Sequence, residues 1–98
     1  MRHGEPPLPR LENVVLDEAG VDDLFATVAR EGEGVDILLK GDVQAYSEGA
    51  TDLADARERL RAGTVLGVQL RYRRGGTAWL DTLMHVPHGV RLVRIEQA

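Results

Sequence analysis

Five side chains in the last third of the chain have the types and spacing of a binding surface. Arginine presents a planar fork of N–H donors that suits carboxylate or phosphate groups, and it also stacks on indole rings. The single tryptophan lies close in sequence to several arginines, and Trp and Arg dominate the energetics of protein interfaces. We therefore predict a binding cluster on one face of a sheet, made of Arg71, Arg73, Trp79, Asp81 and Arg94.

The face on which these side chains lie depends on how two expected strands pair. Residues 65–73 alternate apolar and polar side chains, as a half-buried strand does, and residues 77–84 form the returning strand. A three-residue loop at 74–76, closed by a glycine in the left-handed region, gathers the apolar residues on one face and the arginines on the other. The pairs that this loop predicts are Leu70 with Leu80 and Arg71 with Trp79.

A two-residue loop at 75–76 is the alternative register. It would pair Tyr72 with Trp79 and Leu70 with Asp81, so that apolar and polar side chains would share a face. Because a one-residue slip exchanges the two faces of a strand, the loop decides which side chains enter the core. Segregation of apolar from polar residues favours the three-residue loop.

Three residues near the end of this hairpin could form a different kind of site. Asp81 and His85 project to the same side of a strand and His88 follows in a turn, and three such ligands can hold zinc. No further cluster supports a metal, and His85 as a general base would need a nucleophile, whereas the only serine is Ser47. We therefore predict no metal, no cofactor and no catalytic residue.

Composition indicates a single small globular domain. The 98 residues are 43% hydrophobic and 29% charged, as in ordinary folded domains, and no apolar run approaches the ~20 residues of a membrane span. Residues 1–10 contain three prolines, lack the apolar core of a signal peptide, and are expected to be a flexible lead-in to a domain at 11–98. Without cysteine or an export signal, we expect a cytoplasmic protein with no membrane contact.

Charge is distributed unevenly along the chain. Residues 1–58 hold fourteen acidic and five basic side chains, whereas residues 59–98 hold two acidic and seven basic ones. An acidic helical layer beside a basic sheet would explain this, and so would a positive face presented to an anionic partner. The net charge of −4 disfavours nucleic acid, since each phosphate contact needs a cation. Eleven of the twelve basic residues are arginine, which is typical of a GC-rich bacterial genome.

The first half of the chain predicts the elements that support the cluster. Apolar runs at 11–16 and 35–40 predict two strands, and the helix between them begins at a cap, Asp17, and ends at Gly32. Strand, helix and strand could form a βαβ unit or an antiparallel arrangement with the helix packed across it. The helix buries one stripe of side chains, namely Val21, Leu24, Phe25, Val28 and Ala29.

A second helix is expected at about 51–62, because a thin apolar stripe ends at Gly63. Residues 43–49 do not distinguish a loop from a helix start. A turn at 86–89 leads into a last strand at 90–95, and a four-residue loop at 87–90 would pair this strand with the preceding one. The predicted pairs are Met84 with Val93 and Thr82 with Ile95.

These elements predict an α+β fold in the order β-α-β-α-β-β-β. Two helices pack on a mostly antiparallel sheet of about five strands, and the chain ends in a β-meander. The expected function is a non-enzymatic interaction module that binds a protein partner or its own copy through the C-terminal sheet face. The alternatives are a small-anion or nucleotide binder that uses the arginine cluster, and an accessory enzyme subunit that uses His85 and Asp81.

Overall fold

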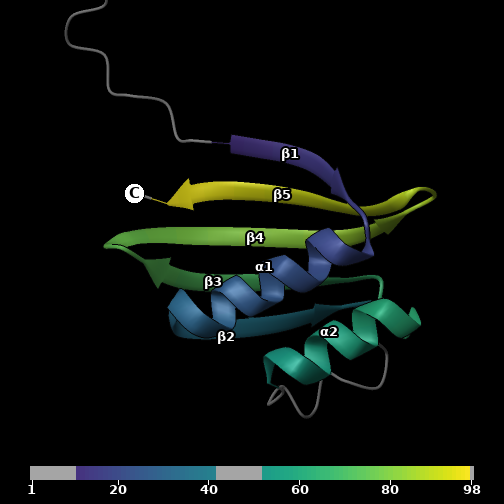
Figure 1. Cartoon of the computed structure of the whole chain (residues 1–98), viewed down its shortest axis with the longest axis horizontal. Helices are drawn as coiled ribbons and strands as arrows, with labels where there is room; N and C mark the ends of the chain where they lie inside the picture. The colour runs from purple at the N-terminus through teal and green to yellow at the C-terminus, as the bar shows by residue number, and fades with distance from the viewer. Residues whose placement is uncertain (1–10, 42–51, 98) are drawn as a thin grey trace, which may run out of the picture.

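The computed structural model describes residues 11–41 and 52–97, which form five strands and two helices (Figure 1). The predicted α+β class and the order of elements are confirmed, while the lead-in at 1–10 and the segment 43–49 lie outside the described residues. The elements are β1 (Leu11–Leu16), α1 (Glu18–Glu31), β2 (Glu33–Lys40), α2 (Leu53–Ala62), β3 (Gly67–Arg74), β4 (Thr77–Val86) and β5 (Gly89–Gln97).

The five strands form one antiparallel sheet in the order β1-β5-β4-β3-β2. β1 and β2 therefore lie at opposite edges, and the chain passes across the sheet between them through α1 (Figure 1). The strand-helix-strand segment is thus not a βαβ unit of neighbouring strands. The meander of β3, β4 and β5 provides the centre of the sheet.

α1 forms as its sequence predicts. The carboxylate of Asp17 accepts a hydrogen bond from the backbone N–H of Gly20 at 2.8 Å, which satisfies a free donor of the first turn. At the other end, the N–H of Gly32 bonds to the carbonyl of Val28. The predicted stripe faces the sheet except for Ala29, which is exposed. Its buried residues are Val21, Leu24, Phe25 and Val28.

α2 is shorter and buries less. Asp52 caps it by accepting a hydrogen bond from the N–H of Asp55 at 2.8 Å. Only Ala56 and Leu60 are buried along it, in agreement with its thin stripe. The helix ends at Gly63, whose φ of 77° lies in the left-handed region that glycine adopts without strain.

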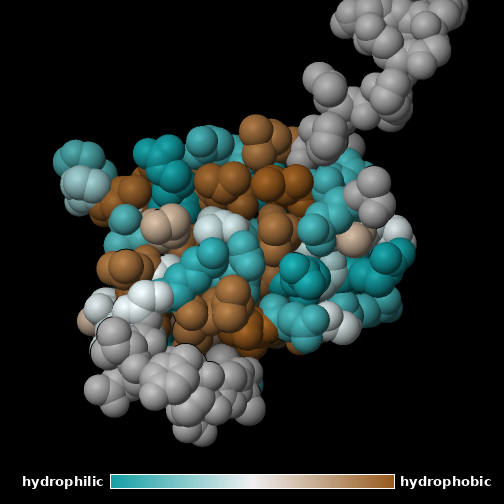
Figure 2. Space-filling model, turned by 180° about the vertical axis from the view of Figure 1, so that it is seen from behind, coloured by the Kyte–Doolittle hydropathy of each residue, from teal (hydrophilic) through white to brown (hydrophobic). Residues whose placement is uncertain are grey.

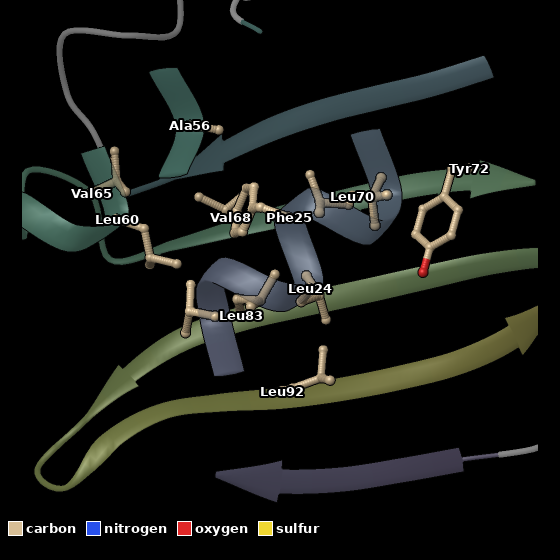
Figure 3. Close-up of a cluster of buried hydrophobic side chains, with 12 residues drawn as sticks. Leu24, Phe25, Ala56, Leu60, Val65, Val68, Leu70, Tyr72, Leu83 and Leu92 are labelled. Atoms are coloured by element: carbon tan, nitrogen blue, oxygen red, sulfur yellow. The ribbon is translucent and has the colours of Figure 1, made fainter. Parts of the chain in front are cut away.

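Both helices lie on the same face of the sheet, and the core is packed between the two layers (Figure 1). Figure 3 shows side chains of α1 meeting those of β3, β4 and β5 in this layer. The buried hydrophobic set is Val21, Leu24, Phe25, Val28, Ala56, Leu60, Val65, Val68, Leu70, Tyr72, Leu83 and Leu92.

The predicted register of the β3–β4 hairpin is wrong. The loop has two residues, 75–76, so Tyr72 pairs with Trp79 and Leu70 pairs with Asp81. The two glycines have φ of 59° and 82°, a type I′ combination that matches the twist of paired strands. A polar residue opposite Leu70 is tolerated because it has its own partners in the core, which the pattern of segregated faces does not reveal.

The predicted β4–β5 register is also wrong, by two residues. The turn occupies 87–88, so Met84 pairs with Arg91 and Thr82 pairs with Val93. A shift of two residues does not change which side chains share a face. The predicted pairs therefore still share one, but it is the face away from the helices and not the core face. Leu83 enters the core instead, and its partner on β5 is Leu92. The predicted core face is therefore right for β3 and inverted for β4 and β5.

Candidate interaction surface

The five predicted site residues are divided between the two faces of the sheet. Trp79 and Asp81 lie on the side that the helices cover, and Arg94 reaches both of them from β5. Arg71 and Arg73 are exposed on the opposite face of β3. The predicted contact between arginine and indole exists, but Arg94 makes it, with its guanidinium carbon 5.9 Å from the centre of the Trp79 ring.

A buried polar network links β3, β4 and β5. Asp81 is fully buried, and its carboxylate accepts a hydrogen bond from the Tyr72 hydroxyl at 2.7 Å. The Arg94 guanidinium donates to both carboxylate oxygens, from Nε at 2.8 Å and from Nη2 at 2.9 Å. Such a bidentate pair is among the strongest charge-assisted contacts in proteins, so Arg94 and Tyr72 together compensate the lost hydration of the buried carboxylate.

The surroundings keep two members of this network protonated. Burial, reinforced by the hydrogen bond to Asp81, raises the pKa of the Tyr72 hydroxyl well above its ordinary value. The hydrogen bond to Asp81 likewise raises the pKa of Arg94, and it outweighs the opposing effect of burial. Since Glu12 also lies 4.0 Å from Arg94, this arginine is already matched by acidic groups and is not a free anion-binding cation.

His85 contributes to the fold on the same side of the sheet. Its ring Nε2 contacts the carbonyl oxygen of Leu60 in the last turn of α2, which ties that helix to β4. Asp81 is engaged by Tyr72 and Arg94 as described. Among residues 11–41 and 52–97, no group of three His, Asp or Glu side chains is arranged to hold a metal ion.

A cleft of about 510 Å³ opens between the start of α1, α2 and the turn that joins β4 to β5. Two arginines line it, but each already has an acidic partner in the cleft. Arg57 pairs with Asp22 at 3.0 Å, and Arg61 pairs with Glu18 at 3.0 Å. The cleft therefore offers an incoming anion little uncompensated charge.

The face of the sheet away from the helices, here called the open face, has a different composition. Large aliphatic side chains are exposed on it, including Leu11 at 63%, Leu38 at 55% and Met84 at 43%. Figure 2 views the molecule from this side and shows hydrophobic residues spread between hydrophilic ones. Strand register places its side chains in three rows, Leu11–Ile95–Leu80–Arg71–Asp36, Asn13–Val93–Thr82–Gln69–Leu38 and Val15–Arg91–Met84–Gly67–Lys40.

Charges on the two sides of the sheet differ in how they are matched. On the helix side, basic residues of α2 and β5 pair with acids at 2.8–3.0 Å. On the open face, Asp36, Lys40 and Arg71 have no ion-pair partner within the described part of the chain. Asp36 and Arg71 are nonetheless direct cross-strand neighbours whose opposite charges attract without forming a close ion pair, whereas Lys40 lies opposite Gly67.

Sequence reasoning missed the role of Tyr72 and the outward position of the aliphatic residues on β4 and β5. One signal for both was present, because two consecutive glycines between strands favour a two-residue type I′ loop. That loop sets Tyr72 opposite Trp79 and turns Leu80 and Met84 away from the helices. Turn chemistry was the better guide to register here than the segregation of faces.

Comparison of the chain with protein-family models, with curated proteins and with solved structures found no match. Neither helix among the described residues is both long enough and apolar enough to cross a membrane. The inference of function therefore rests on the geometry of the two faces of the sheet.

Proposed function

We propose that the chain is a non-enzymatic interaction module that binds a protein through the open face of its sheet. One observation carries this proposal: β4 presents large aliphatic side chains on both sides of the sheet. Leu83 enters the core, while Leu80 and Met84 lie on the open face. An antiparallel sheet with one solvated side normally alternates apolar and polar residues, so aliphatic side chains on both sides favour a second covering layer.

The arrangement of the open face agrees with the anatomy of protein interfaces. Aliphatic residues of β1, β2, β4 and β5 supply apolar area, and Arg91, Thr82 and Gln69 lie among them, in the mixture of apolar and polar surface that non-obligate interfaces show. Burial of one exposed leucine or methionine contributes about 1.5–3 kcal/mol. Several of them together can offset a large part of the free energy lost when two molecules associate.

Other features favour a protein partner over the alternatives. The net charge of −4 opposes binding to nucleic acid, and Arg94 is already matched by acidic groups, which weakens the case for a small-anion site. Asp81 and His85, the residues with acid–base chemistry, contact groups of the fold itself. The lack of cysteine and the preference for arginine over lysine favour the cytoplasm of a bacterium with a GC-rich genome as the setting.

Site-specific photo-crosslinking tests the proposal. A photoreactive amino acid at position 80 should yield a discrete adduct with a protein in cells that express the chain. The same group at Asp23, which is exposed on α1, should yield none. A Val93→Lys substitution next to the probe should remove the adduct without unfolding the domain. Equal labelling at both positions, or no adduct at position 80, would count against the open face as a binding surface.

A further inference from the structure

We infer that the partner of the open face is a second copy of this chain, related by a two-fold axis that runs across the strands along the central row. This inference rests on the proposed function and specifies its partner. The axis follows the row Asn13–Val93–Thr82–Gln69–Leu38. Rotation about this axis places each strand over the same strand of the partner subunit and reverses its direction. A residue two positions before the central row therefore faces the partner residue two positions after it.

This symmetry brings apolar residues together on two strands. On β4, Leu80 faces Met84 of the partner subunit, and on β1, Leu11 faces Val15 of the partner subunit. On β5, Ile95 faces Arg91 of the partner subunit. The guanidinium of Arg91 is directed towards Asn13 at 3.3 Å, which leaves its aliphatic stem for the contact.

The same symmetry gives Asp36 and Lys40 a partner of opposite charge. On β2, Asp36 faces Lys40 of the partner subunit, and the two-fold axis makes this pair twice. On β3, the long side chain of Arg71 faces Gly67 of the partner subunit, where no side chain competes for the space. Two packed sheets cross at an angle of about 30°, and the length of the lysine side chain tolerates the resulting displacement at the edge strand.

A two-fold axis along the strands serves the charges less well. It would place β2 of one copy over β1 of the other, so that Asp36 and Lys40 would meet the aliphatic side chains of that strand. The arginines do not distinguish the two axes, because with either axis one of Arg71 and Arg91 faces Ile95 of the partner subunit and the other faces Gly67. Charges buried against apolar groups without partners are costly, so the axis across the strands is favoured.

The size of the open face lies at the lower end of the range for specific dimers. Five strands spaced about 4.8 Å apart give a width of about 24 Å, and seven residues at about 3.3 Å each give a length of about 23 Å. Two such faces cover about 1,100 Å² as flat areas, before the relief of the side chains is added. Specific interfaces begin near 1,000 Å² of total buried surface.

Sedimentation equilibrium of the purified chain and of charge-reversed variants tests the inference. The wild-type chain should form dimers, and Asp36→Lys or Lys40→Asp alone should raise the dissociation constant at least about tenfold, because each creates two like-charged contacts. The double variant should return to within about threefold of wild type. A mixture of the two single variants should form heterodimers more tightly than either variant self-associates. Asp23→Lys, on the opposite side of the sheet, controls for net charge and should leave the dissociation constant unchanged.

Circular dichroism should show that every variant keeps the wild-type fold, since the substituted side chains lie on an edge strand. A chain that stays monomeric at all accessible concentrations would overturn the inference. So would a dimer whose dissociation constant is unmoved by the reversals. A monomeric chain that still crosslinks another protein from position 80 would overturn the self-association alone and leave the proposed function standing, whereas no adduct would contradict both.

Discussion

Removal of one partner of the Asp81–Arg94 ion pair, in the network of Tyr72, Asp81 and Arg94, should be strongly destabilising. Asp81→Leu removes the acceptor of three hydrogen bonds of 2.7–2.9 Å. It leaves the Arg94 side chain, only 20% exposed, with Glu12 at 4.0 Å as its remaining acidic neighbour. The loss of one partner of a buried ion pair costs about 3–5 kcal/mol, because the other charge stays desolvated. In a domain of this size that corresponds to a fall in Tm of between about 12 and 40 °C.

The complementary substitution should behave in the same way. Arg94→Met leaves a fully buried Asp81 carboxylate with the Tyr72 hydroxyl as its donor, and we expect a loss of about 3–5 kcal/mol again. Replacement of all three residues by apolar groups of similar size should be far milder. The triple variant Tyr72→Phe, Asp81→Leu, Arg94→Met should fall within about 1–2 kcal/mol of wild type, because no polar group is left unpaired.

Urea unfolding of wild type, the single variants and the triple variant measures these differences. The essential quantity is the coupling free energy, the difference between the effect of the triple substitution and the sum of the single effects. Single losses below about 1 kcal/mol, or a triple loss equal to that sum, would refute the reasoning. Small single losses would mean that the network contributes little to stability, and an additive triple loss would mean that the three residues contribute independently.

Three further outcomes are expected. Phe25, 4% exposed, lies at the centre of the α1 stripe, so Phe25→Ala should cost about 3–5 kcal/mol in urea unfolding, and a loss near zero would mean that the ring is dispensable. Burial raises the pKa of Tyr72 above the value of 10.0 of a free tyrosine, so stability should be insensitive to this group below about pH 10 and should fall above it, as the unfolded chain releases a proton that the folded chain retains. Tyr72→Phe should remove that part of the alkaline slope. Gly75, with φ of 59° and open space around it, should tolerate Asn but lose about 1–2 kcal/mol on change to Val, measured as a difference in Tm between the two variants.

The elements of the fold could be predicted because they depend on local patterns. The stripe of α1 repeats every three to four residues, and its ends carry an aspartate cap and a glycine. The alternation along β3 identifies Val68, Leu70 and Tyr72 as one face whatever strand lies beside it. Neither inference needs knowledge of distant partners.

The register of the meander could not be fixed from the same pattern. An outward Asp81 gives two clean faces, and nothing local shows that an inward Asp81 would find partners. Those partners come from other strands: Tyr72 lies nine residues before it and Arg94 thirteen residues after it. The network forms only once β3, β4 and β5 are already aligned, so it is a consequence of tertiary structure that the sequence pattern does not contain.

The register of the meander and the composition of the open face both follow from the orientation of Asp81. With Asp81 outward, Leu80 and Met84 would enter the core, and β4 would expose Trp79 and Leu83 on the same side as Asp81. The chain instead places a carboxylate in the core, matches it with Arg94 and Tyr72, and leaves aliphatic side chains outside. A buried ion pair is seldom more stabilising than apolar residues of similar volume, so core stability alone does not explain this choice. The proposed second layer on the open face would bury the aliphatic residues of β4 and β5 that this register turns outward.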